Sequence, residues 1–337
     1  MSLILLTGAY GFVGTNLSTH LARMGHELWA LDLKSQWELA DTLAHSKRGA
    51  YVRHFDWEEF SAIPWDAIDA VIHLASKAHD TRNVSNARSY FDINVGLTRR
   101  VVDRLLEVKR KEGRKLIVFS SVKAVADHVE GVLTEDAELS PRTPYGQSKL
   151  EAERYVRDRL GDDTSVEPYV LRPCMIHGPG NKGNLNLLYT VVRRGIPWPL
   201  GSFDNQRSFT SIANLMAVIE RLLAGNVVPG TYQIADDEAL STNEIIKIMA
   251  EVLGQQQARI WQISPRLMRG VARVGDTLYL PLNSERLEKL TESYVVSNDR
   301  IKRALGWEHM PIQARDGLKA TLESFATKIV ASSESPA

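Results

Sequence analysis

The 337-residue chain has one cysteine, Cys174, and lacks any apolar run near the roughly 18 residues that span a bilayer. A single thiol excludes an internal disulfide and suits a reducing compartment. The histidines show no metal-ligand spacing, so we expect no metal. Excess charge is also absent, with 41 basic and 41 acidic residues, which argues against a nucleic-acid or membrane partner. Because the N-terminus starts with a strand instead of a signal sequence, we expect a soluble cytoplasmic protein.

A glycine turn near the N-terminus is the first positive signal. The apolar run Leu3–Thr7 is typical of a buried parallel strand, and it leads directly into Gly8, Gly11 and Gly14. Apolar residues then recur at helical spacing, at Val13, Leu17, Leu21 and Met24. Glycine allows close backbone approach to a pyrophosphate, and a helix N-terminus offers unpaired donors and partial positive charge. The pattern predicts a dinucleotide-binding turn.

Strands and helices alternate through the first half. The second strand, Glu27–Leu31, ends at Asp32, which is placed to accept hydrogen bonds from an adenosine ribose diol and to repel a 2′-phosphate. This carboxylate favours NAD over NADP. Further strands are expected at 51–55, 70–74, 116–120 and 169–171, with a helix from about residue 92 between the second and third of them. The alternation predicts an α/β fold of the Rossmann type, a doubly wound parallel sheet with ligands at the carboxyl ends of its strands.

Tyr145 and Lys149 lie four residues apart, so one helical turn places phenol and ammonium on the same face. Thr143 is the candidate N-cap of this helix, and Pro144 fits its first position. A nearby cation favours the phenolate, so Lys149 is expected to lower the pKa of Tyr145. The pair indicates a proton-handling site.

These motifs together resemble those of the extended short-chain dehydrogenases/reductases, and within them the nucleotide-sugar 4-epimerases and 4-ketoreductases. The resemblance spans about residues 3 to 320 and depends on the ordered set, because each motif alone is common. The matching segments are Gly8-x-x-Gly11-x-x-Gly14, His73-Leu74-Ala75-Ser76, Asn94, Ser120-Ser121, Tyr145-x-x-x-Lys149, Arg172-Pro173, Gly178-Pro179-Gly180, Gly183-Asn184-Leu185, Arg207-Ser208-Phe209, Asn214-Leu215 and Leu305-Gly306-Trp307.

The resemblance implies a role for each matching residue. Ser121 would hydrogen-bond the sugar oxygen at C4, Tyr145 would exchange its proton, and Lys149 would hold the nicotinamide ribose. Within the cofactor set, Asp56 would contact adenine and Asn94 would support the active-site backbone. The implied NAD contacts are Gly8, Gly11, Phe12, Val13, Asp32, Asp56, Leu74, Ala75, Ser76, Asn94, Tyr145, Lys149 and Pro173.

The second half is expected to hold the substrate. By resemblance, Asn184 and Arg207 would contact a nucleotide diphosphate, and Leu200, in the segment 195–201, would lie against a uracil-type base. The expected domains are an NAD-binding domain at 1–172, a smaller α/β substrate-binding lobe at 173–330 that is partly interleaved with it, and a flexible tail at 331–337. A homodimer is implied by the resemblance alone.

Departures from the family patterns reduce the number of reactions that we expect. Dehydratases place an Asp-Glu pair where this chain has Val122-Lys123, so dehydration is not expected. His177 replaces a tyrosine beside the sugar pocket, and the turn at 124–126 also differs, which leaves the sugar open. The leading hypothesis is a UDP-sugar 4-epimerase. The alternatives are an NAD(P)H-dependent 4-ketoreductase acting on a UDP-4-keto-6-deoxyhexosamine and a non-catalytic NAD-binding scaffold or sensor.

Overall fold

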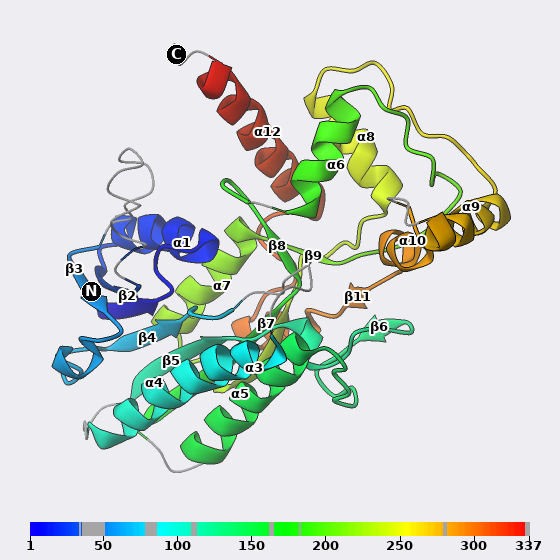
Figure 1. Ribbon diagram of the computed structural model, residues 1–337. Coiled ribbons are helices and arrows are strands. Elements are labelled where there is room, and N and C mark those ends of the chain that lie inside the picture. Colours follow the sequence, from blue (N-terminus) through cyan, green and yellow to red (C-terminus); the bar gives the residue numbers. More distant parts are fainter. Residues whose placement is uncertain are drawn as a thin grey trace.

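A computed structural model describes residues 1–33, 35, 51–77, 86–108, 113–161, 165–181, 183–278 and 282–333. Its centre is a seven-stranded parallel sheet in the order β10-β7-β5-β4-β1-β2-β3 (Figure 1). The strands are β1 (Leu3–Thr7), β2 (Glu27–Asp32), β3 (Arg53–Asp56), β4 (Ala70–His73), β5 (Arg114–Phe119), β7 (Val166–Pro173) and β10 (Gly230–Ile234).

Helices cover both faces of this sheet. Ile4 and Leu6 point to the face covered by α1 (Phe12–Arg23), α7 (Ile212–Ala224) and α11 (Asp299–Leu305). Leu5 points to the opposite face, which α4 (Gly96–Glu107) and α5 (Pro144–Leu160) cover. The near-continuous apolar run of β1 is therefore explained by burial on two sides. The predicted doubly wound parallel sheet is confirmed.

The direction of winding reverses between β1 and β4. The chain first proceeds outward through β2 to β3, then returns to the other side of β1 and continues through β4, β5, β7 and β10. The loops that follow β1 and β4 therefore diverge at the carboxyl ends of these two strands. Open α/β sheets bind ligands at such a point.

The smaller lobe packs α6 (Asn184–Arg193), α8 (Thr242–Val252) and α12 (Ala314–Ser333) around a separate apolar cluster. Two short parallel pairs link it to the sheet, β6 (Val132–Leu133) with β11 (Val295–Val296) and β8 (Met175–His177) with β9 (Phe209–Ser211). Helices α9 (Pro265–Leu278) and α10 (Ser284–Thr291) form a hairpin at its outer end (Figure 1). Residues 331–333 of the expected tail belong to α12, and residues 334–337 lie outside the described residues. Within the described ranges, every helix is too short or too polar to cross a bilayer.

Several element boundaries differ from expectation. The helix expected from about residue 92 begins earlier, with α3 (Ala87–Tyr90), because the Asn86 side chain accepts a hydrogen bond from Arg88 N and caps it. A π-helical turn, Phe91–Val95, joins α3 to α4. The third strand starts two residues late, at Arg53. Thr143 caps α5 and Pro144 occupies its first position, as predicted.

A buried ion pair fixes α5 to β7. Arg172 donates to Glu153 from Nε at 2.9 Å and from a terminal nitrogen at 2.6 Å, and Ser120 also donates to Glu153. Both charged side chains are only 6% exposed. Loss of one partner would leave an uncompensated buried charge, which is far more costly than loss of a surface pair.

We expect Arg172→Met to lower the free energy of unfolding by about 3–5 kcal/mol, because Glu153 would keep a buried charge without its partner. Arg157→Met, which removes the exposed Arg157–Asp158 pair on the same helix, should cost no more than about 1 kcal/mol. Urea titration of both variants checks this contrast. Equal effects would show that the buried pair does not carry the stability assigned to it.

Candidate active site

A cleft of about 310 Å³ opens at the carboxyl edge of the sheet, where β1 and β4 separate. Its walls come from the glycine turn, the ends of β4, β5 and β7, and the first turns of α5. The lining residues are Gly8, Gly11, Phe12, Val13, Gly14, Leu74, Ser76, Phe119, Ser120, Ser121, Tyr145, Lys149, Pro173, Cys174 and Ile176. Elements far apart in sequence therefore place the three predicted catalytic side chains and most of the predicted cofactor residues around one cavity. The predicted cofactor residues outside its lining are Asp32, Asp56, Ala75 and Asn94.

The glycine turn brings backbone against backbone. Gly8 has a φ of +66°, and a Cβ added there would lie 2.7 Å from the amide nitrogen of Ala75. A Cβ on Gly14 would lie 2.4 Å from the carbonyl oxygen of Ala9. Real side chains do not fit such gaps, so glycine at these positions lets the turn pack tightly against Ala75 and Ala9. The turn Gly8–Gly14, which we call the glycine cradle, holds the start of α1 at the cleft, where free backbone N–H groups can bind a phosphate.

The Tyr51 side chain stabilises this turn through hydrogen bonds that the sequence did not indicate. Its hydroxyl lies 2.7 Å from the carbonyl oxygen of Ala9 and 3.1 Å from that of Gly14. Burial raises the pKa of Tyr51, so the hydroxyl stays protonated and donates. The sequence predicts Tyr51 only as the first residue of a strand, so its contact with the glycine turn is visible only in the folded structure.

Asp32 ends β2, next to the cradle. Its carboxylate accepts hydrogen bonds from Tyr10 N at 2.9 Å and Leu33 N at 2.8 Å, which fix its orientation. Burial raises the pKa of Asp32, while the two backbone bonds oppose that shift. Asp56 pairs with Asp32 across β2 and β3, so the two predicted adenosine contacts share one edge of the sheet. Cradle, cavity and carboxylate together fit a dinucleotide such as NAD.

Ser121, Tyr145 and Lys149 meet in the same cleft. Ser121 follows β5, while Tyr145 and Lys149 come from the first turns of α5. The Ser121 hydroxyl is close enough to Tyr145 to lower the pKa of its phenol. Gly146 allows the helix to approach, because a Cβ there would lie 2.3 Å from the Lys123 carbonyl oxygen. The three predicted catalytic side chains are thus brought together.

The electrostatics of the pair differ from the prediction. Burial raises the pKa of Tyr145, and the opposing effect comes from the Ser121 hydrogen bond rather than from Lys149. The Lys149 ammonium donates to the Phe119 carbonyl oxygen at 2.8 Å. Burial lowers the pKa of Lys149 to about 8, although Glu153 opposes this shift. In the folded chain, desolvation therefore outweighs the expected lowering of the Tyr145 pKa by Lys149.

The remaining predicted cofactor residues divide into two groups. Leu74, Ser76 and Pro173 line the cleft, and Ala75 abuts Gly8. Asn94 lies buried behind the lining, where its side chain bonds to both backbone groups of Lys77 and donates to Ser148 Oγ at 2.9 Å. Asn94 therefore ties the backbone of Lys77 to α5 next to the cleft.

Of the four predicted substrate residues, Ser121 lines this cleft, whereas the other three, Asn184, Leu200 and Arg207, do not. Asn184 is exposed at the start of α6. Leu200 is buried, 3% exposed, in a cluster with Met268 and Leu287 of the α9–α10 hairpin, so its side chain packs within the protein. Arg207 donates to the carbonyl oxygens of Glu292, at 3.0 Å, and Lys289. Burial lowers the pKa of Arg207.

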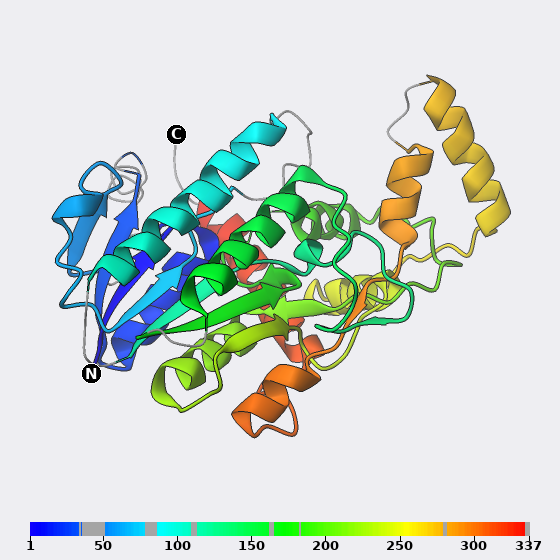
Figure 2. The same ribbon diagram turned by 90° about the horizontal axis from the view of Figure 1, so that it is seen from below.

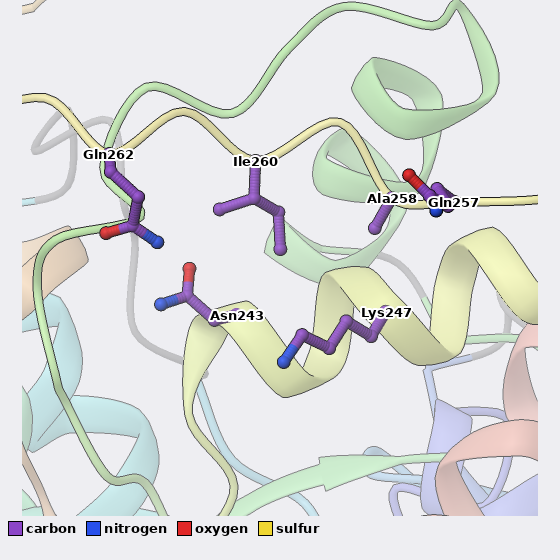
Figure 3. Close-up of a pocket in the computed structure, with 6 residues that line it drawn as sticks. All are labelled: Asn243, Lys247, Gln257, Ala258, Ile260 and Gln262. Atoms are coloured by element: carbon purple, nitrogen blue, oxygen red, sulfur yellow. The ribbon is translucent and has the colours of Figure 1, made fainter.

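A second hollow of about 310 Å³ lies in the smaller lobe, between α8 and the extended segment 257–262. Figure 3 shows Asn243 and Lys247 on α8, with Asn243 pointing toward Gln262. Amides and one lysine line it, without a catalytic acid and base. We find no cluster of three or more potential metal ligands among the residues that the structure describes.

Thr7 and Cys174 are further site residues that sequence reasoning missed. Thr7 Oγ1 accepts a hydrogen bond from Ala75 N at 3.1 Å and lies 2.7 Å from His73 Nδ1. Burial lowers the pKa of His73 to about 3, so this imidazole stays neutral. Cys174 lines the cleft, and burial raises the pKa of its thiol. Only the position of Thr7 at the end of a strand could have suggested its role.

We expect Gly14→Ala to cost about 1–3 kcal/mol in unfolding free energy, because its Cβ would overpack the glycine turn. Affinity for NAD should fall by about tenfold or more as the turn shifts. Gly96→Ala is the matched control, since this helical glycine has open space around its added Cβ, and it should be neutral or stabilising by up to about 1 kcal/mol. Calorimetric NAD titration of both variants provides the test, and unchanged affinity in Gly14→Ala would contradict it.

The buried Lys149 also predicts a pH dependence of stability. The pKa of Lys149 falls from 10.5 in the unfolded chain to about 8 in the folded chain. Between these two pH values Lys149 is protonated in the unfolded chain and neutral in the folded one, so the free energy of unfolding rises with pH. Lys149→Met should lack this gain, and the slope of unfolding free energy against pH should differ from wild type by about 1.4 kcal/mol per unit. Urea titrations from about pH 8 to 10 measure it. Parallel curves for the two proteins would contradict the prediction.

Known proteins share both the sequence and the architecture. The chain is 29% identical over 340 residues to a UDP-glucose 4-epimerase from Vibrio cholerae, covering 96% of this chain and 95% of that protein. It is 26% identical over 318 residues to an N-acetyl-alpha-D-glucosaminyl-diphospho-ditrans,octacis-undecaprenol 4-epimerase from Escherichia coli O157:H7, covering 89% and 84%.

The fold matches that of the UDP-glucuronic acid 4-epimerase from Bacillus cereus, solved with UDP-glucuronic acid and NAD. The TM-score is 0.70 at 18% identity, covering 97% of this chain and 99% of that one. The sequence model described as the NAD dependent epimerase/dehydratase family matches residues 4–235. The glycine cradle and the trio of Ser121, Tyr145 and Lys149 surround one cleft, and Asp32 ends β2; with the matching sequence model, the chain belongs to this family of NAD-dependent enzymes.

Proposed function

We propose that the protein inverts the configuration at C4 of a UDP-linked sugar. The observation that carries this proposal is the placement of Tyr145 and Ser121 in the same cleft as the glycine cradle. Two hydroxyl groups in one wall can hold a single sugar oxygen, while the cradle fixes a dinucleotide beside it. Bound NAD would supply the redox chemistry, accepting hydride from C4 and returning it to the opposite face of the 4-keto sugar.

The chain's own residues would manage the proton. Ser121 would donate to the C4 oxygen, and Tyr145 would take and return the hydroxyl proton. Lys149 has a pKa of about 8 and is therefore charged at neutral pH, where its ammonium would favour the phenolate. Burial excludes water around these groups and strengthens each polar interaction.

Arg207 would hold the diphosphate of the substrate. Its guanidinium has five N–H donors, and the two bonds to Glu292 and Lys289 leave part of this fork available for phosphate oxygens. These bonds also orient the guanidinium. Because Leu200 is turned into the apolar cluster, we propose that only backbone of the 195–201 segment contacts the base.

Incubation of the purified protein with UDP-glucose, UDP-N-acetylglucosamine and their C4 epimers, with NAD and without reductant, tests the proposal. We expect interconversion of a gluco and galacto pair with no net change in NADH absorbance. Tyr145→Phe should lower kcat by roughly 10²–10⁴-fold, because the proton carrier is removed. Tyr155→Phe, on the same helix but bonded to Asp103, should retain wild-type kcat. Absence of any C4 product from a protein that binds NAD would refute the proposal.

The same assay separates the alternatives. A 4-ketoreductase would consume NAD(P)H in proportion to a UDP-4-keto sugar and would leave the UDP-hexoses unchanged. A sugar linked to a polyprenyl diphosphate is a second candidate substrate, because the Escherichia coli relative is named for one. Both kinds of substrate carry a diphosphate that Arg207 could hold, so the two should be compared directly. Light scattering would test the homodimer that belongs to this proposal.

A further inference from the structure

Helix α9 carries an apolar stripe that the rest of the described chain leaves uncovered. Leu267, Val271, Val274 and Leu278 are between 44% and 61% exposed. Their spacing of four, three and four residues places them on one side of the helix. Just before the helix, Trp261 is also exposed. Isolated apolar side chains are common on protein surfaces, but four of them on one side of a helix form a continuous apolar face.

The neighbouring face of α9 is already packed. Met268 and Ala272 are buried against Leu200 and Leu287. A Cβ on Gly275 would lie 1.9 Å from the Leu282 carbonyl oxygen, so the glycine allows the hairpin to close tightly. The helix is therefore held in place by its own core, and the exposed stripe is a second apolar face.

Positive charge accompanies this stripe. Arg266, Arg269 and Arg273 are exposed, and none forms a salt bridge with a described residue. Asp276 is the one carboxylate between residues 265 and 278, so α9 carries three positive charges against one negative charge. On a helical wheel, Arg269 lies on the opposite side, roughly 170° from the centre of the stripe, whereas Arg266 and Arg273 lie roughly 110–130° from that centre. Long guanidinium side chains at that angle reach the level of a surface on which the stripe rests.

The position of α9 in the molecule makes contact possible. Figures 1 and 2 both place the α9–α10 hairpin at the outer end of the smaller lobe, away from the central sheet. Arg207 binds the carbonyl oxygens of Lys289 and Glu292 at the end of α10, so the hairpin is tied to the proposed substrate-binding half. A surface that binds α9 would therefore lie next to the proposed substrate-binding half of the protein.

We propose that α9 docks the protein on an anionic phospholipid surface. The apolar stripe would enter the boundary between headgroups and acyl chains, and the arginines would bind lipid phosphates. A basic amphipathic helix with an adjacent tryptophan has the composition of an interfacial anchor. Pairing of the stripe with the same stripe of a second copy would bring two sets of arginines together, which like-charge repulsion disfavours. The docking does not depend on the sugar that the enzyme uses.

Co-sedimentation of the full-length protein with lipid vesicles tests this proposal. We expect binding to vesicles that contain phosphatidylglycerol and weak binding to pure phosphatidylcholine. Raising the salt to about 1 M, where the Debye length is roughly 3 Å, should reduce binding without abolishing the apolar contribution. The triple variants Leu267→Ser/Val271→Ser/Val274→Ser and Arg266→Glu/Arg269→Glu/Arg273→Glu should each lower affinity by about tenfold or more.

Val228→Ser and Arg221→Glu are the matched controls. Both residues are exposed and lie outside the hairpin, so these variants should bind vesicles as wild type does. NAD affinity should stay unchanged in every variant, which separates lost docking from lost folding. Activity on a soluble UDP-sugar should also persist, so that a failure of docking and a failure of the proposed function can be told apart.

A fluorescent label gives an independent readout. Cys174 is buried, so Val271→Cys introduces the accessible thiol for an environment-sensitive dye. Its emission should shift to the blue with phosphatidylglycerol vesicles, whereas a dye on Val228→Cys should not respond. The proposal is overturned if the serine variant binds vesicles like wild type, if wild type binds no vesicle, or if the serine variant instead dissociates a dimer of the wild-type protein.

Discussion

The active site depends on the way one face of α5 is held against the sheet. Tyr145, Lys149 and Glu153 follow one another at four-residue spacing, so they form a single column along the helix. Glu153 ends this column in a buried pair with Arg172 of β7 and also accepts a hydrogen bond from Ser120, the neighbour of Ser121. Strand order places β5 next to β7. The ion pair thus sets the height and rotation of α5, and with them the position of the phenol relative to Ser121.

Sequence reasoning identified the layers and most of the site because both follow local patterns. A continuous apolar run, three glycines and a strand-end carboxylate each express a backbone constraint that nearby residues reveal. Thr143 and Pro144 marked the start of α5 for the same reason. The support beneath the site was not accessible in this way, since Tyr51 meets the glycine turn, and Arg172 meets Glu153, only through tertiary packing.

The substrate side was harder to predict for a related reason. The side chain of Leu200 could face a base or a core, and the apolar residues that decide the matter, Met268 and Leu287, come some 70–90 residues later in the chain. Net charge is likewise an average. The balance of 41 basic and 41 acidic residues describes the whole chain, whereas α9 combines three exposed arginines with an exposed apolar stripe. An average over the chain cannot exclude a local basic amphipathic surface.

Desolvation acts on both members of the Tyr145–Lys149 pair and favours the neutral form of each. It raises the pKa of the phenol and lowers that of the ammonium to about 8. A phenolate alone in this cleft would be strongly disfavoured, and so would an isolated ammonium. A phenolate beside an ammonium carries no net charge, so the pair is better tolerated than either ion by itself. The same burial that keeps Tyr145 protonated at rest therefore means that its ionisation would need a compensating positive charge. A charged Lys149, one helical turn away on the same face of α5, would supply that charge.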